Sequence, residues 1–408
     1  MVTLFLDTLG IGLIIPVFPS LVATFMGHDA ARTSHLYGTF IATYAAMQVL
    51  FAPVVGGLSD RFGRRPVLLA SLFGAAVNYA LLATVASLPL LFVGRVIAGI
   101  TGASFSTANA YIADVTPPKD RARVFGMMGA VFGLGFIVGP ALGGIVGSFG
   151  VRVPFLLAAG LNLLNFTYGM LVLPESLAPA DRRPFSLARS NSIGALKALQ
   201  RHPVTLGLAA TLTCASMAQQ ILQSMWALYG MGRFHWTQID VGASLAAVGL
   251  GTAVVQGGLI RYLLPRLGER RAMVFGLSLS ALSFAGIGFA SRGWMLLALV
   301  APLSLGSIAG PAGQSIVSRH FGPSEQGEIQ GALSSIQSFT NIIAPLLATH
   351  LYAVFGSPGS VPFVPGAPFL AGAAFQSLGL VLAARLFARL PAALDERDRG
   401  AASVAADG

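Results

Sequence analysis

Long apolar runs alternate with short polar connections along the whole chain. About 20 apolar residues cross the hydrocarbon core of a bilayer as one helix, and the runs reach this length. The pattern predicts an all-α membrane protein with twelve transmembrane helices at 2–24, 35–57, 66–86, 88–112, 124–148, 153–173, 204–230, 239–263, 271–290, 293–315, 327–355 and 366–390. The longest polar stretch lies midway, so the expected parts are a six-helix bundle at 1–173, a middle loop at 174–203, a second six-helix bundle at 204–390 and a tail at 391–408.

The composition agrees with lipid as the main solvent. Of the 408 residues, 55% are hydrophobic and 10% are charged, whereas a soluble domain carries about 25% charged residues. The net charge of +10 does not indicate nucleic acid, because the basic residues sit in short clusters between apolar runs. With one cysteine, no metal-ligand spacing among the histidines and no phosphate-binding Gly-Lys-Ser/Thr loop, the sequence predicts no enzyme, no metal and no cofactor.

Basic residues are distributed unevenly between alternate connections. The connections after even-numbered helices and the C-terminal end hold 20 Lys and Arg residues, and the connections after odd-numbered helices hold 4. Positive residues of membrane proteins concentrate on the cytoplasmic side. We therefore expect both termini and the middle loop to be cytoplasmic.

The two halves of the chain are similar at a constant offset. A shift of 205 residues places the loop 61–65 (RFGRR) on 266–270 (RLGER), and it also places Pro118, Gly126 and Pro140 on identical residues of the second half. Each half has its basic loop after its second helix, so the two six-helix units are parallel repeats. Such repeats predict a binding site between the halves near the bilayer midplane.

The loop between the second and third helices combines glycines, an acid and several bases. Glycines permit a tight turn, and the carboxylate of Asp60 can accept hydrogen bonds from an arginine or a helix N-terminus. The loop is therefore a candidate latch that holds one conformation and releases it; the alternative is a topology signal and turn. The gating residues would be Gly56, Asp60, Arg61, Gly63, Arg64 and Arg65.

Small residues line one face of the fifth helix. Gly135, Gly139 and Gly143 are four residues apart, and small faces let membrane helices approach closely. Pro140 lies beside this face, and proline frees a backbone carbonyl and bends a helix. Two interpretations stay open: plain helix packing, or a bend that gates a cavity.

Asp7 and Arg95 are the acid and the base expected deep within predicted helices. A charge there costs about 3 kcal/mol or more, and burial favours the protonated form of a carboxyl group. Asp7 is therefore the candidate for proton coupling, unless its position near the chain start leaves it at a hydrated interface. The glycines and prolines that follow it predict an irregular first helix. Arg95 shares a helix face with Asn109 and would pair with Asp7, an anionic substrate or backbone carbonyls.

Uncharged polar residues form two stripes at helical spacing. Lipid penalises such faces, so we expect the stripes to line a wet cavity or to bond to each other. The stripe on the seventh helix is Ser216, Gln219, Gln220 and Gln223, and the stripe on the eleventh is Ser334, Gln337, Ser338 and Asn341.

These segments resemble the major facilitator superfamily, and most closely its tetracycline/proton antiporters. The resemblance is carried by 6–16 (LDTLGIGLIIP), 44–48 (YAAMQ), 59–69 (SDRFGRRPVLL), 94–103, 110–114 (AYIAD) and the antiporter-like motif of Gly135, Gly139, Pro140 and Gly143. The first 175 residues match strongly and the second half more weakly. The resemblance implies export of a small amphipathic drug from a bacterial inner membrane by a monomer. It also implies that the proton gradient supplies the energy and that Asp7, Gln48 and Arg95 have functional roles.

Three positions depart from the pattern of that family. The third helix has Asn78, the eighth Thr252 and the ninth Ser280, where the family has an aspartate, a histidine and an aspartate. None of these side chains exchanges a proton near pH 7, so coupling must rest on fewer groups, and tetracycline as the substrate stays open. Asn78 would then line the cavity. Two alternatives also stay open: a nutrient facilitator or importer on the same fold, and a transport-dead membrane sensor.

Overall fold

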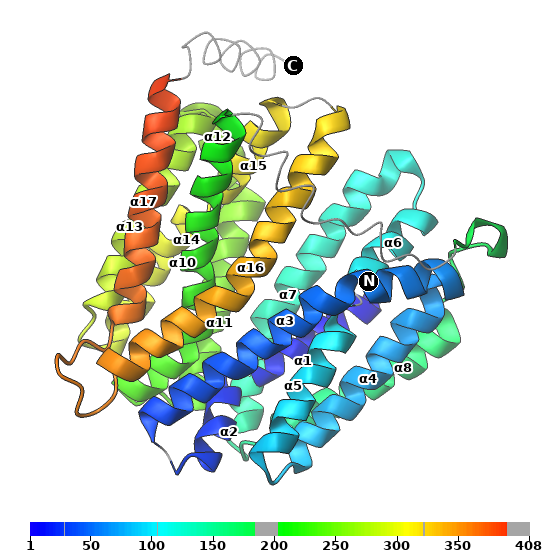
Figure 1. The fold of residues 1–408 in the computed structure, drawn as a ribbon, viewed down its shortest axis with the longest axis horizontal. Coiled ribbons are helices and arrows are strands. Elements are labelled where there is room, and N and C mark those ends of the chain that lie inside the picture. The colour runs from blue at the N-terminus through cyan, green and yellow to red at the C-terminus, as the bar shows by residue number, and fades with distance from the viewer. Residues whose placement is uncertain (28, 104, 184–202, 321–322, 390–408) are drawn as a thin grey trace. The chain divides into compact units, whose positions relative to one another are not determined.

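The computed structural model describes residues 1–408 except 28, 104, 184–202, 321–322 and 390–408 (Figure 1). Helices make up the regular structure, and no strand occurs within these described ranges. The predicted all-α class is therefore confirmed. Most of the predicted middle loop, and the predicted tail at 391–408, lie outside the described residues.

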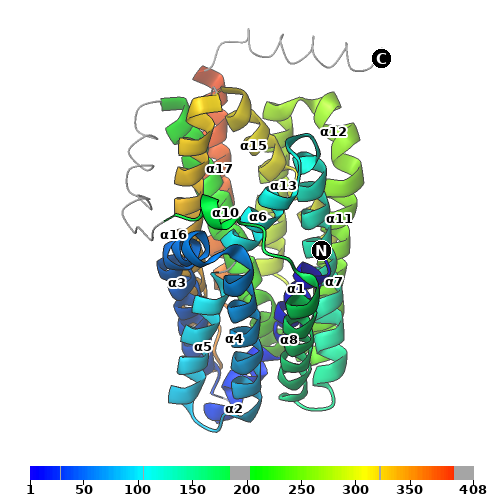
Figure 2. The same cartoon turned by 90° about the vertical axis from the view of Figure 1, so that its right-hand side faces the viewer.

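Each predicted helix of the first half corresponds to one helix or to a pair of helices (Figure 2). The first predicted helix is split into α1 and α2, and the fourth is split into α5 and α6. The bounds are α1 (Val2–Ile14), α2 (Phe18–Phe25), α3 (Ala30–Phe62), α4 (Arg64–Thr84), α5 (Leu88–Gly102), α6 (Phe105–Val115), α7 (Arg121–Gly147) and α8 (Val153–Val172).

The second half follows the same order. Its elements are α10 (Pro203–Phe234), α11 (Gln238–Val254), the π-helical turn η4 (Val255–Leu259), α12 (Ile260–Leu267), α13 (Glu269–Gly288), α14 (Gly293–Gly306), α15 (Ala309–His320), α16 (Pro323–Phe355) and α17 (Ala367–Arg389). In the described ranges, 10 helices are long and apolar enough to cross a membrane, and the bent pair α1–α2 raises this to 11. The remaining predicted segment is α10, whose 32 residues include the first polar stripe.

Both interruptions in the first half have a local cause. The chain bends by 43° between α1 and α2, where Pro16 lies in the connection and Pro19 is the second residue of α2. Proline lacks an amide hydrogen and therefore removes a hydrogen bond of the helix, so the predicted irregularity of the first helix is present. The second interruption follows Gly102, whose carbonyl oxygen accepts a hydrogen bond of 3.1 Å from the side-chain amide of Gln48. That bond satisfies a carbonyl group near the point where the helix stops.

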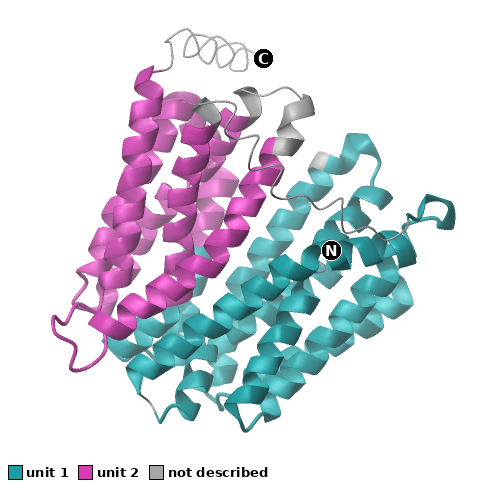
Figure 3. Ribbon diagram, in the orientation of Figure 1, with its two compact units in different colours: residues 1–190, 226–249 teal, residues 191–225, 250–408 magenta. Residues whose placement is uncertain are grey.

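The chain divides into two compact units (Figure 3). Unit 1 comprises residues 1–190 and 226–249, and unit 2 comprises residues 191–225 and 250–408. The last turns of α10 and the first part of α11 therefore belong to unit 1. Within unit 1, α1 packs against α7 and α8, and α4 packs against α5 and α8. Within unit 2, α13 packs against α14, α15 and α17.

The contact between α1 and α7 joins backbone to backbone. A Cβ atom added to Gly139 would lie 2.7 Å from the Cα atom of Gly12, and one added to Gly135 would lie 2.7 Å from side-chain carbons of Thr8. At Gly143 an added Cβ would meet the backbone of Leu13. Real Cβ atoms do not come this close to their neighbours, so the small face of α7 is fully used in packing against α1.

The two duplicated loops turn at equivalent glycines. Gly63 has a φ of 106° and Gly268 has a φ of 74°, and these are the glycines that the offset of 205 residues superposes. Side chains other than glycine rarely adopt such angles. The two loops differ in the residue that begins the next helix, which is Arg64 for α4 and Glu269 for α13. Glu269 is buried, and its carboxylate accepts a hydrogen bond from Ser315.

A pair of alanine substitutions on α7 tests the packing. Gly139→Ala should lower the free energy of unfolding by about 1–3 kcal/mol, the usual cost of overfilling a packed core. Gly129→Ala, on the same helix but with no neighbour within 4 Å of an added Cβ, should leave stability unchanged or raise it by up to about 1 kcal/mol. Thermal unfolding of the two purified variants measures the difference. Equal melting temperatures would contradict the proposed backbone contact.

Candidate functional site

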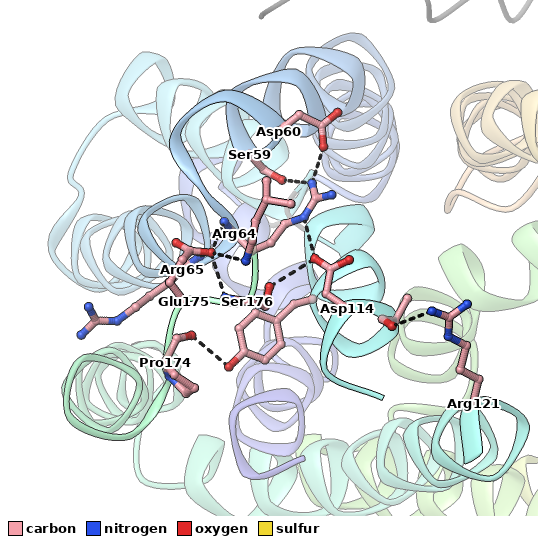
Figure 4. A network of polar contacts seen from close by, with 12 residues as sticks. Ser59, Asp60, Arg64, Arg65, Asp114, Arg121, Pro174, Glu175 and Ser176 are labelled. Carbon is pink, nitrogen blue, oxygen red and sulfur yellow. Dashed lines mark hydrogen bonds and ion pairs between the residues drawn. The ribbon is translucent and has the colours of Figure 1, made fainter. Parts of the chain in front are cut away.

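One arginine holds two acids at the start of α4 (Figure 4). The Nη1 atom of Arg64 lies 2.5 Å from Oδ1 of Asp60, and its Nε atom lies 3.2 Å from Oδ2 of Asp114. Nη1 also donates a hydrogen bond of 2.6 Å to the hydroxyl oxygen of Ser59. The Arg64 side chain is 13% exposed, so solvent screens these pairs less than it screens fully exposed ones. We call Asp60, Arg64 and Asp114 the latch.

The other predicted residues of this loop differ in their contacts. Arg65 donates a hydrogen bond of 2.6 Å to the carbonyl oxygen of Met170 on α8. Arg61 is exposed and lies over the ring of Phe62, 5.2 Å from its centroid. Gly56 has no neighbour within 4 Å of an added Cβ, whereas Gly63 supplies the left-handed turn. The loop thus divides into latch residues and residues that shape or anchor the turn.

Buried aromatic side chains surround the two predicted intramembrane charges. Asp7 on α1 is half-buried, and Arg95 on α5 is only 6% exposed. The phenol groups of Tyr44 and Tyr79 interact electrostatically with both of them. The guanidinium carbon of Arg95 lies 4.3 Å from the ring centroid of Phe18, a favourable cation–π distance.

Neither intramembrane charge forms an ion pair in the described part of the chain. The Nε and Nη2 atoms of Arg95 are buried and have no hydrogen-bond acceptor. The Oδ1 atom of Asn78 is also buried and has no hydrogen-bond donor. Buried polar atoms without partners are costly. Unit 1 therefore holds hydrogen-bonding capacity that its own side chains leave unused.

Two further predicted residues lie close to the break between α5 and α6. Gln48 bonds the carbonyl oxygen of Gly102 and also forms a side-chain hydrogen bond with Tyr44. Asn109 is half-buried on α6, beyond the break. Gln48 thus connects the break in the fourth predicted helix to the tyrosines around Asp7 and Arg95.

The antiporter-like motif of α7 contacts a second element on its other side. Glycines that follow the motif lie against the start of α11, because Cβ atoms added to Gly144 and Gly147 would overlap with Gln238. The carbonyl oxygen of Pro140 lies against Gly242. The helix α7 runs without interruption across Pro140. Within unit 1 the small residues of α7 therefore face α1 on one side and the α10–α11 connection on the other.

The two predicted polar stripes bond to each other within unit 2. Ser216 donates a hydrogen bond of 2.7 Å to Oε1 of Gln337, and Gln220 donates one of 2.7 Å to Oδ1 of Asn341. Gln337 also donates to Asn341, over 2.9 Å. Gln219 and Gln223 are exposed on α10. Some members of the stripes therefore bond across helices, and the lining of a wet cavity by the stripes stays a prediction.

Unit 2 contains an open cavity of about 760 Å³. Drug-sized ligands occupy pockets of about 300–1,000 Å³. Among the described residues, the lining carries amides, hydroxyls and apolar groups and no charged side chain, and it consists of Leu212, Thr213, Ser216, Gln256, Gly310, Pro311, Gln314, Gln330, Leu333, Ser334, Ile336 and Gln337. Gln256 belongs to η4, and π-helical turns are frequent at functional positions.

A smaller cavity of about 550 Å³ lies within unit 1. Its lining combines one aromatic and one thioether side chain with hydroxyl and amide groups, and it consists of Ser20, Gly147, Ser148, Met231, Trp236, Thr237, Gln238 and Ile239. The hydroxyl of Ser20 contacts the sulfur atom of Met231 at 3.6 Å. This cavity joins α2, α7 and the connection between α10 and α11.

Sequence reasoning missed several residues of these sites. Gln256 and Gln314 are polar residues within predicted helices, and this alone could have marked them. They were missed because neither belongs to a set of four polar residues at helical spacing, as the stripe residues do. Tyr44 was noted only as part of the family-like string 44–48, and Tyr79 was not singled out for a site, because an uncharged aromatic side chain does not stand out in an apolar helix. Glu175 follows the sixth predicted helix and accepts hydrogen bonds from the N–H groups of Arg64 and Arg65. The sequence does not show that these two distant segments are in contact, so Glu175 was missed.

Comparisons with known proteins agree with this architecture. The sequence model of the Major Facilitator Superfamily matches residues 1–291 and 258–405. The class C tetracycline resistance protein of Escherichia coli is 41% identical over 355 residues, which cover 87% of this chain and 89% of that protein. The class B protein of Escherichia coli is 37% identical over 380 residues and covers 92% of both chains. The nucleoside transporter NupG has a similar fold, with a TM-score of 0.75 at 13% identity over 96% of this chain and 98% of that one.

Cysteine labelling tests whether the cavity of unit 2 holds water. In a Cys214→Ser background, which removes the only cysteine, Gln314→Cys should react with a hydrophilic maleimide at least about tenfold faster than Gln376→Cys. Thiols react as thiolates, which form in water and are disfavoured in apolar surroundings, and Gln376 is only 5% exposed. A gel-shift assay with a maleimide-linked polymer measures both rates. Equal labelling of the two positions would exclude a wet cavity at Gln314.

Proposed function

The chain belongs to the Major Facilitator Superfamily and is a drug-efflux transporter, and on that premise we propose that it exports a small amphipathic compound in exchange for protons. The exchange would proceed by alternating access, with the proton gradient as the energy source. The protein is a multi-pass membrane protein. Its site of action would be the bacterial inner membrane, with both termini and the basic loops on the cytoplasmic side.

The unpaired carboxyl group of Asp7 carries the proposal of proton coupling. A coupling group has to be protonated in one state of the transport cycle and ionised in another, so a permanent ion pair would disable it. Asp7 has no basic partner in the described residues and lies within electrostatic reach of Tyr44 and Tyr79. Arg95 interacts with the same two phenols. A change of charge at Asp7 would therefore be felt at Arg95 through their shared neighbours.

Coupling in this chain would use few ionisable groups. Asn78 is 1% exposed and Ser280 is 7% exposed, and neither side chain titrates in the physiological range. Thr252 is half-buried on α11. These three positions leave Asp7 as the proposed proton carrier, with a simple exchange in place of a relay along several carboxylates.

The proposed substrate is a compound of the tetracycline type. The relatives named as tetracycline resistance proteins cover most of this chain. The cavity of unit 2 offers amide and hydroxyl groups without a charge, including those of Gln256, Gln314 and Gln337. Such a lining suits a flat compound with many hydroxyl, carbonyl and amide groups. Within unit 2, Gln219, Gln220, Gln223 and Asn341 would extend this polar surface. Within unit 1, the residues proposed to contact a substrate are Gln48, Asn78, Arg95 and Asn109.

The latch is proposed to stabilise one state of the transport cycle. Arg64 bonds two acids that belong to different helices, Asp60 on α3 and Asp114 on α6. Any movement that separates these helix ends breaks a charge-assisted contact, which is worth about 1.5–3 kcal/mol. The glycines of α7 would complement the latch by allowing α1 and the start of α11 to move against a smooth surface.

Substitution of Asp7 tests the coupling group. Asp7→Asn should abolish drug export driven by an imposed pH difference, because an amide cannot release a proton. Asp7→Glu, which keeps a carboxyl group, should retain part of the activity. Everted membrane vesicles with tetracycline as the probe measure export, and the amount of protein in the membrane serves as the control. Full activity of Asp7→Asn would remove Asp7 from the mechanism.

Substitution of Arg64 tests the latch. Arg64→Ala should lower the maximal export rate about tenfold, the effect of losing roughly 1.4 kcal/mol from one state of the cycle. Arg123→Ala, an exposed base at the start of α7, should export at the rate of the unmodified protein. The same vesicle assay compares them. A latch role is contradicted when both variants export equally fast.

A further inference from the structure

Glu175 lies beyond the end of α8 and bonds the start of α4 (Figure 4). Its Oε1 atom accepts hydrogen bonds from the backbone N–H groups of Arg64 at 2.8 Å, Ser176 at 3.0 Å and Leu177 at 3.1 Å. Its Oε2 atom accepts one from the N–H group of Arg65 at 3.3 Å. One carboxylate thus satisfies backbone donors from two segments that are more than a hundred residues apart in the sequence.

The fit between this carboxylate and the turn is close. The first N–H groups of a helix have no partner within the helix, and the helix N-terminus carries a partial positive charge. A carboxylate is suited to both features. A Cβ atom added to Gly63 would overlap with the carboxylate of Glu175, so the left-handed glycine both makes the turn and leaves room for the acid.

Neighbouring residues tie the same segment to the latch. We call residues 173–183 the strap. The hydroxyl of Ser176 donates a hydrogen bond of 3.2 Å to Oδ2 of Asp114, the same oxygen atom that Arg64 binds. The N–H group of Arg183 donates one of 3.0 Å to the carbonyl oxygen of Asp60, and Tyr111 donates one of 3.1 Å to the carbonyl oxygen of Pro174. The strap therefore contacts both acids of the latch.

We propose that Glu175 is a positioning residue of the latch. It holds the first residues of α4 so that the guanidinium group of Arg64 reaches Asp60 and Asp114 at the same time. It also makes the strap part of the latch, so that the latch opens only when the carboxylate leaves the N-terminus of α4. This inference rests on the proposed function of the latch and adds the first residues of the middle loop to it.

The chemistry of the site requires an acid at this position. All of the groups that point at Glu175 are N–H donors, and a carboxylate is an acceptor only. Glutamine has nearly the same shape, but it lacks the negative charge, and its NH2 group in place of Oε2 would face the N–H group of Arg65. Glu175→Gln is therefore a test of charge and acceptor capacity with little change in volume. Asp181→Asn is the matched control, because Asp181 is an exposed acid of the same strap.

The reactivity of a buried position beside the latch reports whether the latch is closed. Ser59 is 0% exposed, and its hydroxyl accepts a hydrogen bond from Arg64. Ser59→Cys in the full-length Cys214→Ser chain should label slowly with a hydrophilic maleimide while the latch is closed. In this background Glu175→Gln and Arg64→Ala should each label roughly tenfold faster, the effect of losing one charge-assisted bond. Asp181→Asn should label at the background rate, and equal melting temperatures and elution volumes show that all variants are folded.

The double variant decides between positioning and general stabilisation. If Glu175 acts through Arg64, Glu175→Gln together with Arg64→Ala should label no faster than Arg64→Ala alone, because residues of one network are not additive. Labelling of Glu175→Gln at the background rate, or effects of the two substitutions that multiply, would overturn the proposal. The role of the latch in transport is tested separately. If Arg64→Ala exports at the unmodified rate, the latch has no role in transport, whatever the labelling rates are.

Discussion

The position of α1 is set by its backbone contact with the glycine face of α7, and the buried charges of unit 1 depend on that position. The helix carries Asp7, and the bend after it brings Phe18 over the guanidinium group of Arg95. A side chain at Gly139 would displace the helix as a whole, since the contact at Gly12 leaves no space for a Cβ atom. Small residues on α7 thus determine where an acid on another helix lies, which links the packing interpretation of the motif to transport.

The helical part of the fold could be read from the sequence because it depends on local rules. Apolar length, prolines and glycines predicted the helices, the irregularity of the first one and the duplicated turn at Gly63 and Gly268. The break after Gly102 and the π-helical turn η4 were not predicted, and at Gly102 the carbonyl group accepts a hydrogen bond from the amide of Gln48, which comes from a distant segment. The same limit applies to the sites. Single charged residues in apolar helices stand out, whereas the role of Glu175 becomes visible only when α8 and α4 are side by side.

Polar groups in this protein compensate each other in two different ways. In the latch every charged group has a partner, and several partners are shared, as Asp114 is by Arg64 and Ser176. Around Asp7 and Arg95 the polar atoms are close together but incompletely paired. Complete pairing suits a contact that fixes a conformation, and incomplete pairing suits a place where a proton or a ligand arrives and leaves. The contrast supports different roles for the two groups within one unit.

The duplicated turns begin their helices with opposite charges, Arg64 in the first half and Glu269 in the second. The two loops, RFGRR at 61–65 and RLGER at 266–270, agree at three of five positions, and one of the differences is this reversal of charge. A transfer of the second turn onto the first would set a glutamate between Asp60 and Asp114, so that three carboxylates would meet where an ion-pair network now lies. Such a chain would lose its closed latch by repulsion alone. The opposite charges at these two equivalent positions therefore limit how similar the two loops can become while the latch of unit 1 stays closed.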